Sequence, residues 1–281
     1  VSSRRCSSDP RPARPEQVFT RAMPGNMKLD FYYDCISPYS YFAFVALQRY
    51  AEIWTNVTIE LKPFLLGGVV AKTGNLPPLA RPWAKATMKE QMQHFQRNAE
   101  FFNIPKMLSM PANFFGKDGP ADKRGLARDV RYQRLLTAVR RLYPESLWDV
   151  TALLFEHFWA CCSARDKAGN VAMDEEILAD ICRRAGLSAQ EAAACVAAIG
   201  ADETKALLAA TVDEAVARGA YGAPTIVVAW TSYGHEMVFF GSDRFEQLAF
   251  ACGLPWYGPD PSRPTTFSGP PAAAAEPQAK L

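Results

Sequence analysis

The predicted strands of this chain lie near its two ends, with a long helical stretch between them. Lys28 to Tyr33 alternates and is aromatic, as a half-buried strand is, and a second strand is predicted over Val57 to Leu61. Two more, Thr225 to Trp230 and Glu236 to Phe240, follow only after the helical stretch. The two halves of the chain must therefore meet in space to complete one sheet.

The first two predicted strands are joined by a helix and form a β-α-β unit. Ser37 is placed to cap this helix, Pro38 takes its first position, and apolar residues recur at helical spacing as far as Tyr50. The unit has about the length that a right-handed crossover needs. We therefore expect these strands to lie in one sheet with the helix across it.

The central stretch, from Arg81 to about Arg218, has the apolar spacing of helices throughout. Six helices are predicted, near 83–103, 122–142, 146–162, 174–185, 188–198 and 203–218. A last helix is expected from Asp243 to Cys252, after the final strand pair. This order, β-α-β, helices, then β-β-α, predicts an α/β thioredoxin-like domain that is interrupted by an all-helical insertion.

The domain boundaries follow from this order. The thioredoxin-like domain is predicted over 28–80 and 219–257, and the helical insertion over 81–218. Ten of the 21 prolines lie in the two terminal segments, 1–27 and 258–281. We expect a disordered N-terminal extension and a flexible C-terminal tail there, because such segments cannot bury a core.

Both terminal segments carry features that bear on location in the cell. Residues 1–27 have a composition weakly like a mitochondrial leader, and fit equally well an extension that is no part of the mature protein. Ala279-Lys280-Leu281 is similar to the Ser-Lys-Leu peroxisomal address. The expected location is therefore peroxisomal or mitochondrial, with the cytoplasm as the alternative.

Composition excludes several classes of protein. The net charge is +2 and Lys and Arg form no cluster, so neither a nucleic-acid site nor an anionic-membrane site is expected. The longest uncharged apolar run, Tyr221 to Trp230, is about half of what a membrane span requires. Seven cysteines without Cys-x-x-Cys or His/Cys ligand spacing argue against a disulfide scaffold and against a metal site.

The reactive corner of a thioredoxin-like sheet is the loop between the first strand and the first helix. Redox-active members carry two cysteines there, at the positions that Ser37 and Ser40 occupy. Intramolecular thiol–disulfide exchange is therefore excluded at this corner, and Cys35 has no resolving partner in the sequence.

A serine at a helix N-terminus has two interpretations. Ser37 is an ordinary N-cap, or it also stabilises a bound thiolate together with the helix dipole. Lowering a thiol pKa by two units requires about 2.7 kcal/mol, which one hydroxyl hydrogen bond and a dipole can supply. Ser37 would donate, because neither His nor Lys lies beside it as a base, and no G-x-S-x-G motif indicates a hydrolase.

Four motifs together resemble the kappa-class glutathione transferases and their bacterial relatives, the 2-hydroxychromene-2-carboxylate isomerases. They span Phe31 to Tyr41, Gly74 to Pro78, Tyr221 to Thr225 and Phe240 to Arg244, in the family's order, and the likeness covers about 28–257. The resemblance implies glutathione as co-substrate, small electrophiles as partners, no tightly bound cofactor and a homodimer. It also implies that Ser37 supports the glutathione thiolate.

The resemblance assigns further glutathione contacts. Pro224 matches the cis-proline of thioredoxin-like proteins, and the backbone of Ala223 would pair with the cysteinyl residue as an added strand. Ser242 and Asp243, at the expected start of the last helix, would bind the γ-glutamyl carboxylate and ammonium. Ala223 is smaller than the Leu or Val typical of the family, which widens the predicted site.

The remaining assignments are the residues beside Ser37 and the loop after the second strand. Pro38 and Tyr39 join the glutathione site by resemblance, and Asn75 matches a residue that hydrogen-bonds glutathione. Arg81 and Lys85 are weaker candidates for the glycyl carboxylate, because the spacing after Asn75 departs from the family. Gly116 to Ala127 is either a lid over the electrophile site or a long interhelical loop.

Four functions stay open at this point. Conjugation of glutathione to an electrophile is the first, and glutathione-dependent isomerisation of a hydroxychromene carboxylate is the second. A disulfide oxidoreductase of the DsbA type is disfavoured by Ser37 and Ser40. The fourth is a non-catalytic adaptor that binds glutathione.

Overall fold

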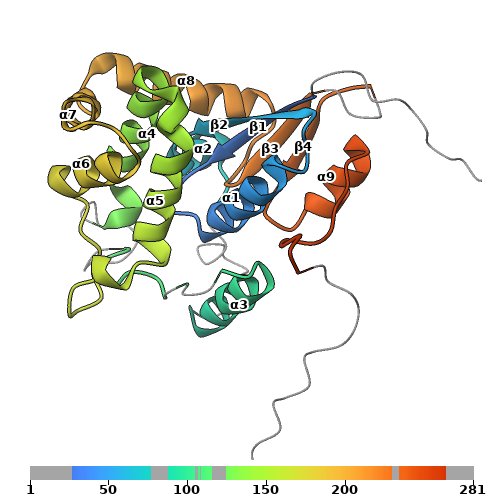
Figure 1. Ribbon diagram of the computed structural model, residues 1–281, viewed down its shortest axis with the longest axis horizontal. Helices are drawn as coiled ribbons and strands as arrows, with labels where there is room; N and C mark the ends of the chain where they lie inside the picture. The colour runs from blue at the N-terminus through green and yellow to red at the C-terminus, as the bar shows by residue number, and fades with distance from the viewer. Residues whose placement is uncertain are drawn as a thin grey trace, which may run out of the picture.

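The computed structural model describes residues 27–76, 88–104, 107, 109–115, 125–229 and 234–263. A four-stranded sheet with strand order β2-β1-β3-β4 forms its centre (Figure 1). The strands are β1 (Met27–Tyr33), β2 (Val57–Pro63), β3 (Thr225–Ala229) and β4 (Met237–Phe240). β1 is parallel to β2 and antiparallel to β3, and β3 is antiparallel to β4. The two halves of the chain thus meet where β1 pairs with β3, as predicted.

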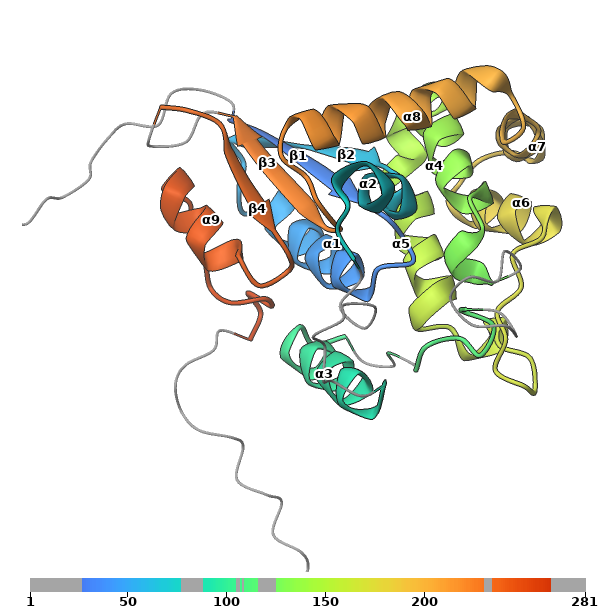
Figure 2. The same ribbon diagram turned by 180° about the vertical axis from the view of Figure 1, so that it is seen from behind.

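Both faces of the sheet are covered by helices. Alternate residues of β1, among them Leu29 and Phe31, pack in one core with α1 (Pro38–Ala51) and α9 (Phe245–Cys252). Tyr32 faces the opposite side and packs with α2 (Leu66–Thr73) and α8 (Asp202–Ala217). Figures 1 and 2 show α1 on one side of the sheet and α2 with α8 on the other. The expectation of a half-buried first strand is therefore wrong, because β1 is a central strand with helices over both faces.

The helices of the insertion gather beside one end of the sheet (Figure 1). They are α4 (Arg131–Leu142), α5 (Leu147–Trp159), α6 (Glu175–Arg184) and α7 (Ala189–Ala198), while α3 (Met88–Phe101) lies apart from them against α1. Two predicted bounds are wrong. α4 begins at Arg131 rather than near 122, after a short 3-10 turn, and α5 ends at Trp159, before a second such turn.

α8 joins the two parts of the molecule. It packs on α2 and β2 as well as on α4, so this helix of the predicted insertion covers the sheet and also contacts another insertion helix (Figure 2). The division between insertion and thioredoxin-like domain at residue 218 stays a prediction. Among the described residues, no helix is long and apolar enough to cross a membrane.

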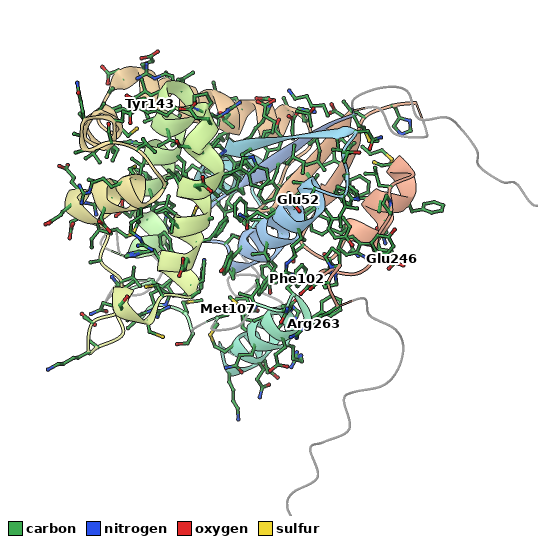
Figure 3. The ribbon with its side chains drawn as sticks, viewed as in Figure 1. Glu52, Phe102, Met107, Tyr143, Glu246 and Arg263 are labelled. Atoms are coloured by element: carbon green, nitrogen blue, oxygen red, sulfur yellow. The ribbon has the colours of Figure 1, made fainter. Side chains whose placement is uncertain are left out.

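The segment after α9 holds α3 against α1. Arg49 of α1 donates from Nη1 to the carbonyl oxygens of Phe102, at 2.6 Å, and Pro259, at 2.8 Å. Arg263 donates to Oδ1 of Asn103 at 3.1 Å, and Figure 3 labels Phe102 and Arg263 near this junction. Residues 258–260 of the predicted tail are therefore buried, whereas Ser262 and Arg263 are exposed. The extension over 1–26 and the rest of the tail, with Ala279-Lys280-Leu281, lie outside the described residues.

Candidate functional site

Ser37 caps α1 as the sequence predicts. Its backbone is extended, its N–H donates to the carbonyl of Asp34 at 3.0 Å, and its Oγ accepts from the N–H of Ser40 at 3.2 Å. The hydroxyl itself donates to the carbonyl oxygen of Ala223, 3.2 Å away. The one hydroxyl therefore caps a helix and also links the first half of the chain to the second.

Ala223 and Pro224 lie opposite Ser37, at the entry to β3. The peptide bond between them is cis, as the family resemblance predicts. The carbonyl of Pro224 accepts from the N–H of Gly241 at 3.0 Å, which ties this turn to the end of β4. The sheet thus brings Ser37 and the Ala223 backbone together from positions 186 residues apart.

Asn75 lies close to the same turn. It follows Gly74, which ends α2 in the left-handed conformation with φ of 67°. Its Nδ2 donates to the carbonyl of Tyr221 at 2.7 Å, and its Oδ1 accepts from the N–H of Leu76 at 2.9 Å. The Asn75 side chain is therefore held at Tyr221, two residues before Ala223, whose backbone is predicted to contact glutathione.

Ser242 and Asp243 do not begin the last helix, contrary to expectation. α9 begins at Phe245, because Gly241 has a φ of 98° and turns the chain before the helix starts. Ser242 is buried in this turn, whereas the Asp243 side chain is 68% exposed and pairs with Arg244 at 3.3 Å. Both residues still precede the N-terminus of α9.

Pro38 and Tyr39 form the first turn of α1 and connect it to α3. Pro38 is buried, and the hydroxyl of Tyr39 accepts from Nε2 of Gln91 at 2.7 Å. The Tyr39 ring also packs edge-on against Phe95, with ring centroids 5.5 Å apart. Burial raises the pKa of Tyr39, so its hydroxyl stays protonated.

Asp34 is a residue of this corner to which the sequence assigned no role. Its carboxylate is fully buried and accepts from the N–H groups of Ile36, at 3.2 Å, and Leu66, at 2.8 Å, and from the Tyr132 hydroxyl at 3.3 Å. Burial raises the pKa of this carboxyl to about 6, although these donors oppose the shift. The available signal was an acidic residue directly after an aromatic strand.

Cys35 and Ser40 are both buried. Burial raises the pKa of the Cys35 thiol well above its ordinary value, so this sulfur is no thiolate nucleophile. Its backbone carbonyl accepts from Nε1 of Trp159 at 2.8 Å, which fixes the loop before Ser37 to α5. The insertion thereby helps to position the reactive corner.

Two sets of predicted residues cannot be placed. Arg81 and Lys85, the weaker candidates for the glycyl carboxylate, lie outside the described residues. Of the loop from Gly116 to Ala127, only residues 125–127 are described, and Leu126 begins a 3-10 turn. The two interpretations of that loop stay open.

The geometry of the corner suits binding of an anion rather than attack by serine. In the described part of the chain, the hydrogen-bond partners of the Ser37 hydroxyl are an N–H and a carbonyl, and neither can take its proton as a base. The N-terminus of α1 adds a dipole that favours negative charge beside Ser37. A bound thiolate is an anion that this hydroxyl can stabilise.

Comparisons with known proteins identify the family of this chain. The model of the DsbA-like thioredoxin domain family matches residues 28–252. Glutathione S-transferase kappa 1 of Rattus norvegicus is 32% identical over 85% of this chain and 96% of its own, and the Homo sapiens protein of that name is 31% identical over 83% and 94%. A solved 2-hydroxychromene-2-carboxylate isomerase superposes with a TM-score of 0.58 at 19% identity, over 81% of this chain and 95% of its own.

The fold and the corner around Ser37 define the class of protein, a thioredoxin-like protein without the redox cysteines. The chain belongs to the DsbA-like thioredoxin family and, within it, to the kappa-class glutathione transferases.

Proposed function

We propose that this protein is an enzyme that conjugates glutathione to electrophilic small molecules and that Ser37 donates a hydrogen bond to the glutathione thiolate. The contact between the Ser37 hydroxyl and the Ala223 carbonyl carries the proposal, because it joins the thiolate donor to the backbone that would hold the cysteinyl residue. The relatives named glutathione S-transferase kappa support it. A thiol titrates near pH 8.5, so a shift of about two units makes most of it thiolate at neutral pH.

The remaining site residues fit a γ-glutamyl tripeptide. The Ala223 backbone would pair with the cysteinyl residue, and Asn75 is held two residues away on the Tyr221 carbonyl. The turn with Ser242 and the exposed carboxylate of Asp243 would receive the γ-glutamyl carboxylate and ammonium. Pro38 and Tyr39 would form the wall between this site and α3.

The chemical step needs little from the protein beyond this placement. The thiol loses its proton to water, the sulfur forms a bond to the electrophilic carbon, and the leaving group departs with its electron pair. Stabilisation of the thiolate and proximity of the electrophile supply the rate enhancement.

Titration of glutathione thiolate absorbance tests the proposal in the wild type, Ser37→Ala and Ser188→Ala. Ser188 caps α7 and also accepts an N–H bond, so Ser188→Ala removes a helix cap without touching the site. We expect a lowered thiol pKa in the wild type and in Ser188→Ala, and an ordinary pKa in Ser37→Ala. The proposal fails if glutathione does not bind or if Ser37→Ala keeps the lowered pKa.

Two assays separate the possible outcomes of catalysis. Conjugation of a halonitrobenzene should proceed and fall in Ser37→Ala, whereas turnover of a 2-hydroxychromene-2-carboxylate alone would assign the protein to isomerisation. A homodimer, in a peroxisomal or mitochondrial location, completes the proposal. Sedimentation velocity tests the dimer, and imaging of an N-terminally tagged chain with and without Ala279-Lys280-Leu281 tests the peroxisomal address.

A further inference from the structure

The hydroxyl of Ser37 has a single proton, and the structure shows which atom receives it. The N–H of Ser40 is a donor and cannot accept it, so the proton points to the carbonyl of Ala223. Ser37 is 5% exposed and Ala223 is 9% exposed, so water has little access to this bond. Before a thiol binds, the Ser37 hydroxyl therefore already donates to the Ala223 carbonyl the proton that would stabilise a bound thiolate.

The carbonyls on either side of Ala223 have donors of their own, whereas the Ala223 carbonyl depends on Ser37. Pro224 accepts from the N–H of Gly241 at 3.0 Å, and Gly222 accepts from the hydroxyl of Thr225 at 2.9 Å. In the part of the chain that the structure describes, Ala223 precedes the β3 ladder, and the donor to its carbonyl is Ser37. A buried carbonyl without a donor is unfavourable. Ser37 can therefore turn toward a sulfur readily only when another donor reaches this carbonyl.

We propose that the Ala223 carbonyl determines which thiols this site activates. A cysteinyl peptide has an amide N–H separated from its sulfur by the α and β carbons. Its N–H replaces the Ser37 hydroxyl at the Ala223 carbonyl, and the hydroxyl turns to the sulfur. A thiol without that N–H binds without activation, because Ser37 keeps its bond to Ala223.

This inference rests on the proposed function, since it assumes that the cysteinyl backbone pairs with Ala223. The inference goes further because thiol activation then depends on a ligand group that does not itself react, the cysteinyl N–H. The substrate class becomes thiols of N-acylated cysteine, and simple alkyl thiols are excluded from activation.

An ester analogue of glutathione tests the inference. In this probe an oxygen replaces the cysteinyl N–H, while the thiol and both terminal groups are kept. Thiolate absorbance of each bound ligand is followed against pH in the wild type, in Ser37→Ala and in Ser37→Thr, which restores a hydroxyl. We expect the pKa of bound glutathione to lie about one unit or more below that of the bound analogue, which is about tenfold in the ratio of thiolate to thiol. Ser37→Ala should abolish this difference, and Ser37→Thr should restore it.

The outcomes separate this inference from the function on which it rests. Equal lowering of both pKa values in the wild type would overturn the selection by Ala223 and leave the proposed function standing. An ordinary pKa for both ligands would overturn the proposed function itself. Failure of the analogue to bind at concentrations that saturate with glutathione would also overturn the inference, since the N–H would then contribute to affinity and not to activation.

Discussion

Two buried carboxylates, one in β1 and one in the loop after it, have opposite surroundings. Asp30 in β1 lies near three cations, Lys28 at 3.4 Å, Lys62 at 3.6 Å, and Arg218 in a direct contact. Among the described residues, the hydrogen-bond donors to Asp34, just after β1, are neutral: two backbone N–H groups, a tyrosine hydroxyl and the side-chain amide of Gln133. Both side chains are almost completely buried. Burial is therefore not what distinguishes them.

The difference follows from what each carboxylate holds in place. Two of these cations, Lys62 and Arg218, also contact Glu214, so this cluster fastens α8 to the sheet. Asp34 instead fixes the loop before Ser37, the start of α2 and one turn of α4. A cation beside Asp34 would lie near the proposed thiolate site and would compete with Ser37 for the sulfur. Neutral donors position the loop without adding such a charge.

Removal of Lys62 is expected to have the largest effect. Its side chain is 7% exposed and contacts Asp30 and Glu214, so Lys62→Met removes the most buried of the three cations that face the Asp30 carboxylate. We expect the free energy of unfolding in urea to fall by about 4 kcal/mol. Lys72→Met is the control, because Lys72 and Asp213 form an exposed pair and its loss should change stability by about 0.5 kcal/mol or less. A loss no greater than the control's would show that Arg218 alone suffices for Asp30.

The surroundings of Asp34 predict a pH dependence of stability. Burial raises its pKa from 3.8 to about 6, so the folded protein binds this proton more tightly than the unfolded chain. Its contribution is therefore present at low pH and is lost as pH rises through about 6, by about 3 kcal/mol in total. The measurement is the difference in unfolding free energy between wild type and Asp34→Asn, followed as pH rises from 3.8 through about 6.

Glu60 supplies a control of opposite sign. Burial opposes its ionisation, but the hydrogen bond from Lys28 and the charge of Lys62 keep its pKa below the ordinary value. The corresponding difference for Glu60→Gln should rise with pH. A flat curve for Asp34→Asn would contradict the assignment of a neutral set of partners to Asp34.

Loss of one neutral donor should have a smaller effect. The Tyr132 hydroxyl helps to keep the pKa of Asp34 from rising further, so Tyr132→Phe should raise that pKa and reduce stability by about 1.5 kcal/mol. NMR titration of the Asp34 carboxyl carbon gives the pKa directly. Tyr33→Phe is the matched variant, since its hydroxyl bonds Thr151 at 2.7 Å, and it should leave the pKa of Asp34 unchanged.

The smallest effect is the difference between the cap of α1 and that of α7. Ser188→Ala should lower the unfolding free energy by about 1 kcal/mol, as the loss of an N-cap does. Ser37→Ala should cost about 1 kcal/mol more, because it also removes the donor to the buried Ala223 carbonyl. Near-equal losses would mean that the Ala223 carbonyl does not need Ser37 as its donor, which would contradict the selection of thiols proposed above. A loss for Ser37→Ala that exceeds the control by several-fold would make the bond from Ser37 to Ala223 structural, like the contacts of Asp30.

Local sequence predicted the elements whose signals lie within them. Ser37 and Pro38 fix the start of α1, and β-branched runs mark the strands. α2 was not predicted, because its two glycines are poor helix formers and its N-terminal N–H at Leu66 bonds Asp34, 32 residues away. The start of α9 was misplaced because Ser242 and Asp243 look like a cap, whereas the turn at Gly241 comes first.

The site likewise contains one contact that the sequence predicts and one residue role that it does not. The contact of Ser37 with Ala223 follows from the order of strands, since β1 pairs with β3 and places the two loops together. The role of Asp34 could not be predicted, because its partners Leu66 and Tyr132 become neighbours only in the folded chain. Long-range donors leave no local pattern, whereas caps and strand runs do.

The bond between Ser37 and Ala223 also sets when the corner exists during folding. During synthesis, α1 emerges early, but Ala223 follows only after the whole helical block. Contacts of such large sequence separation form slowly, because a long loop must close first. A nascent chain that ends before β3 has the serine without the carbonyl that orients its hydroxyl, so the corner is complete only when the last strands dock.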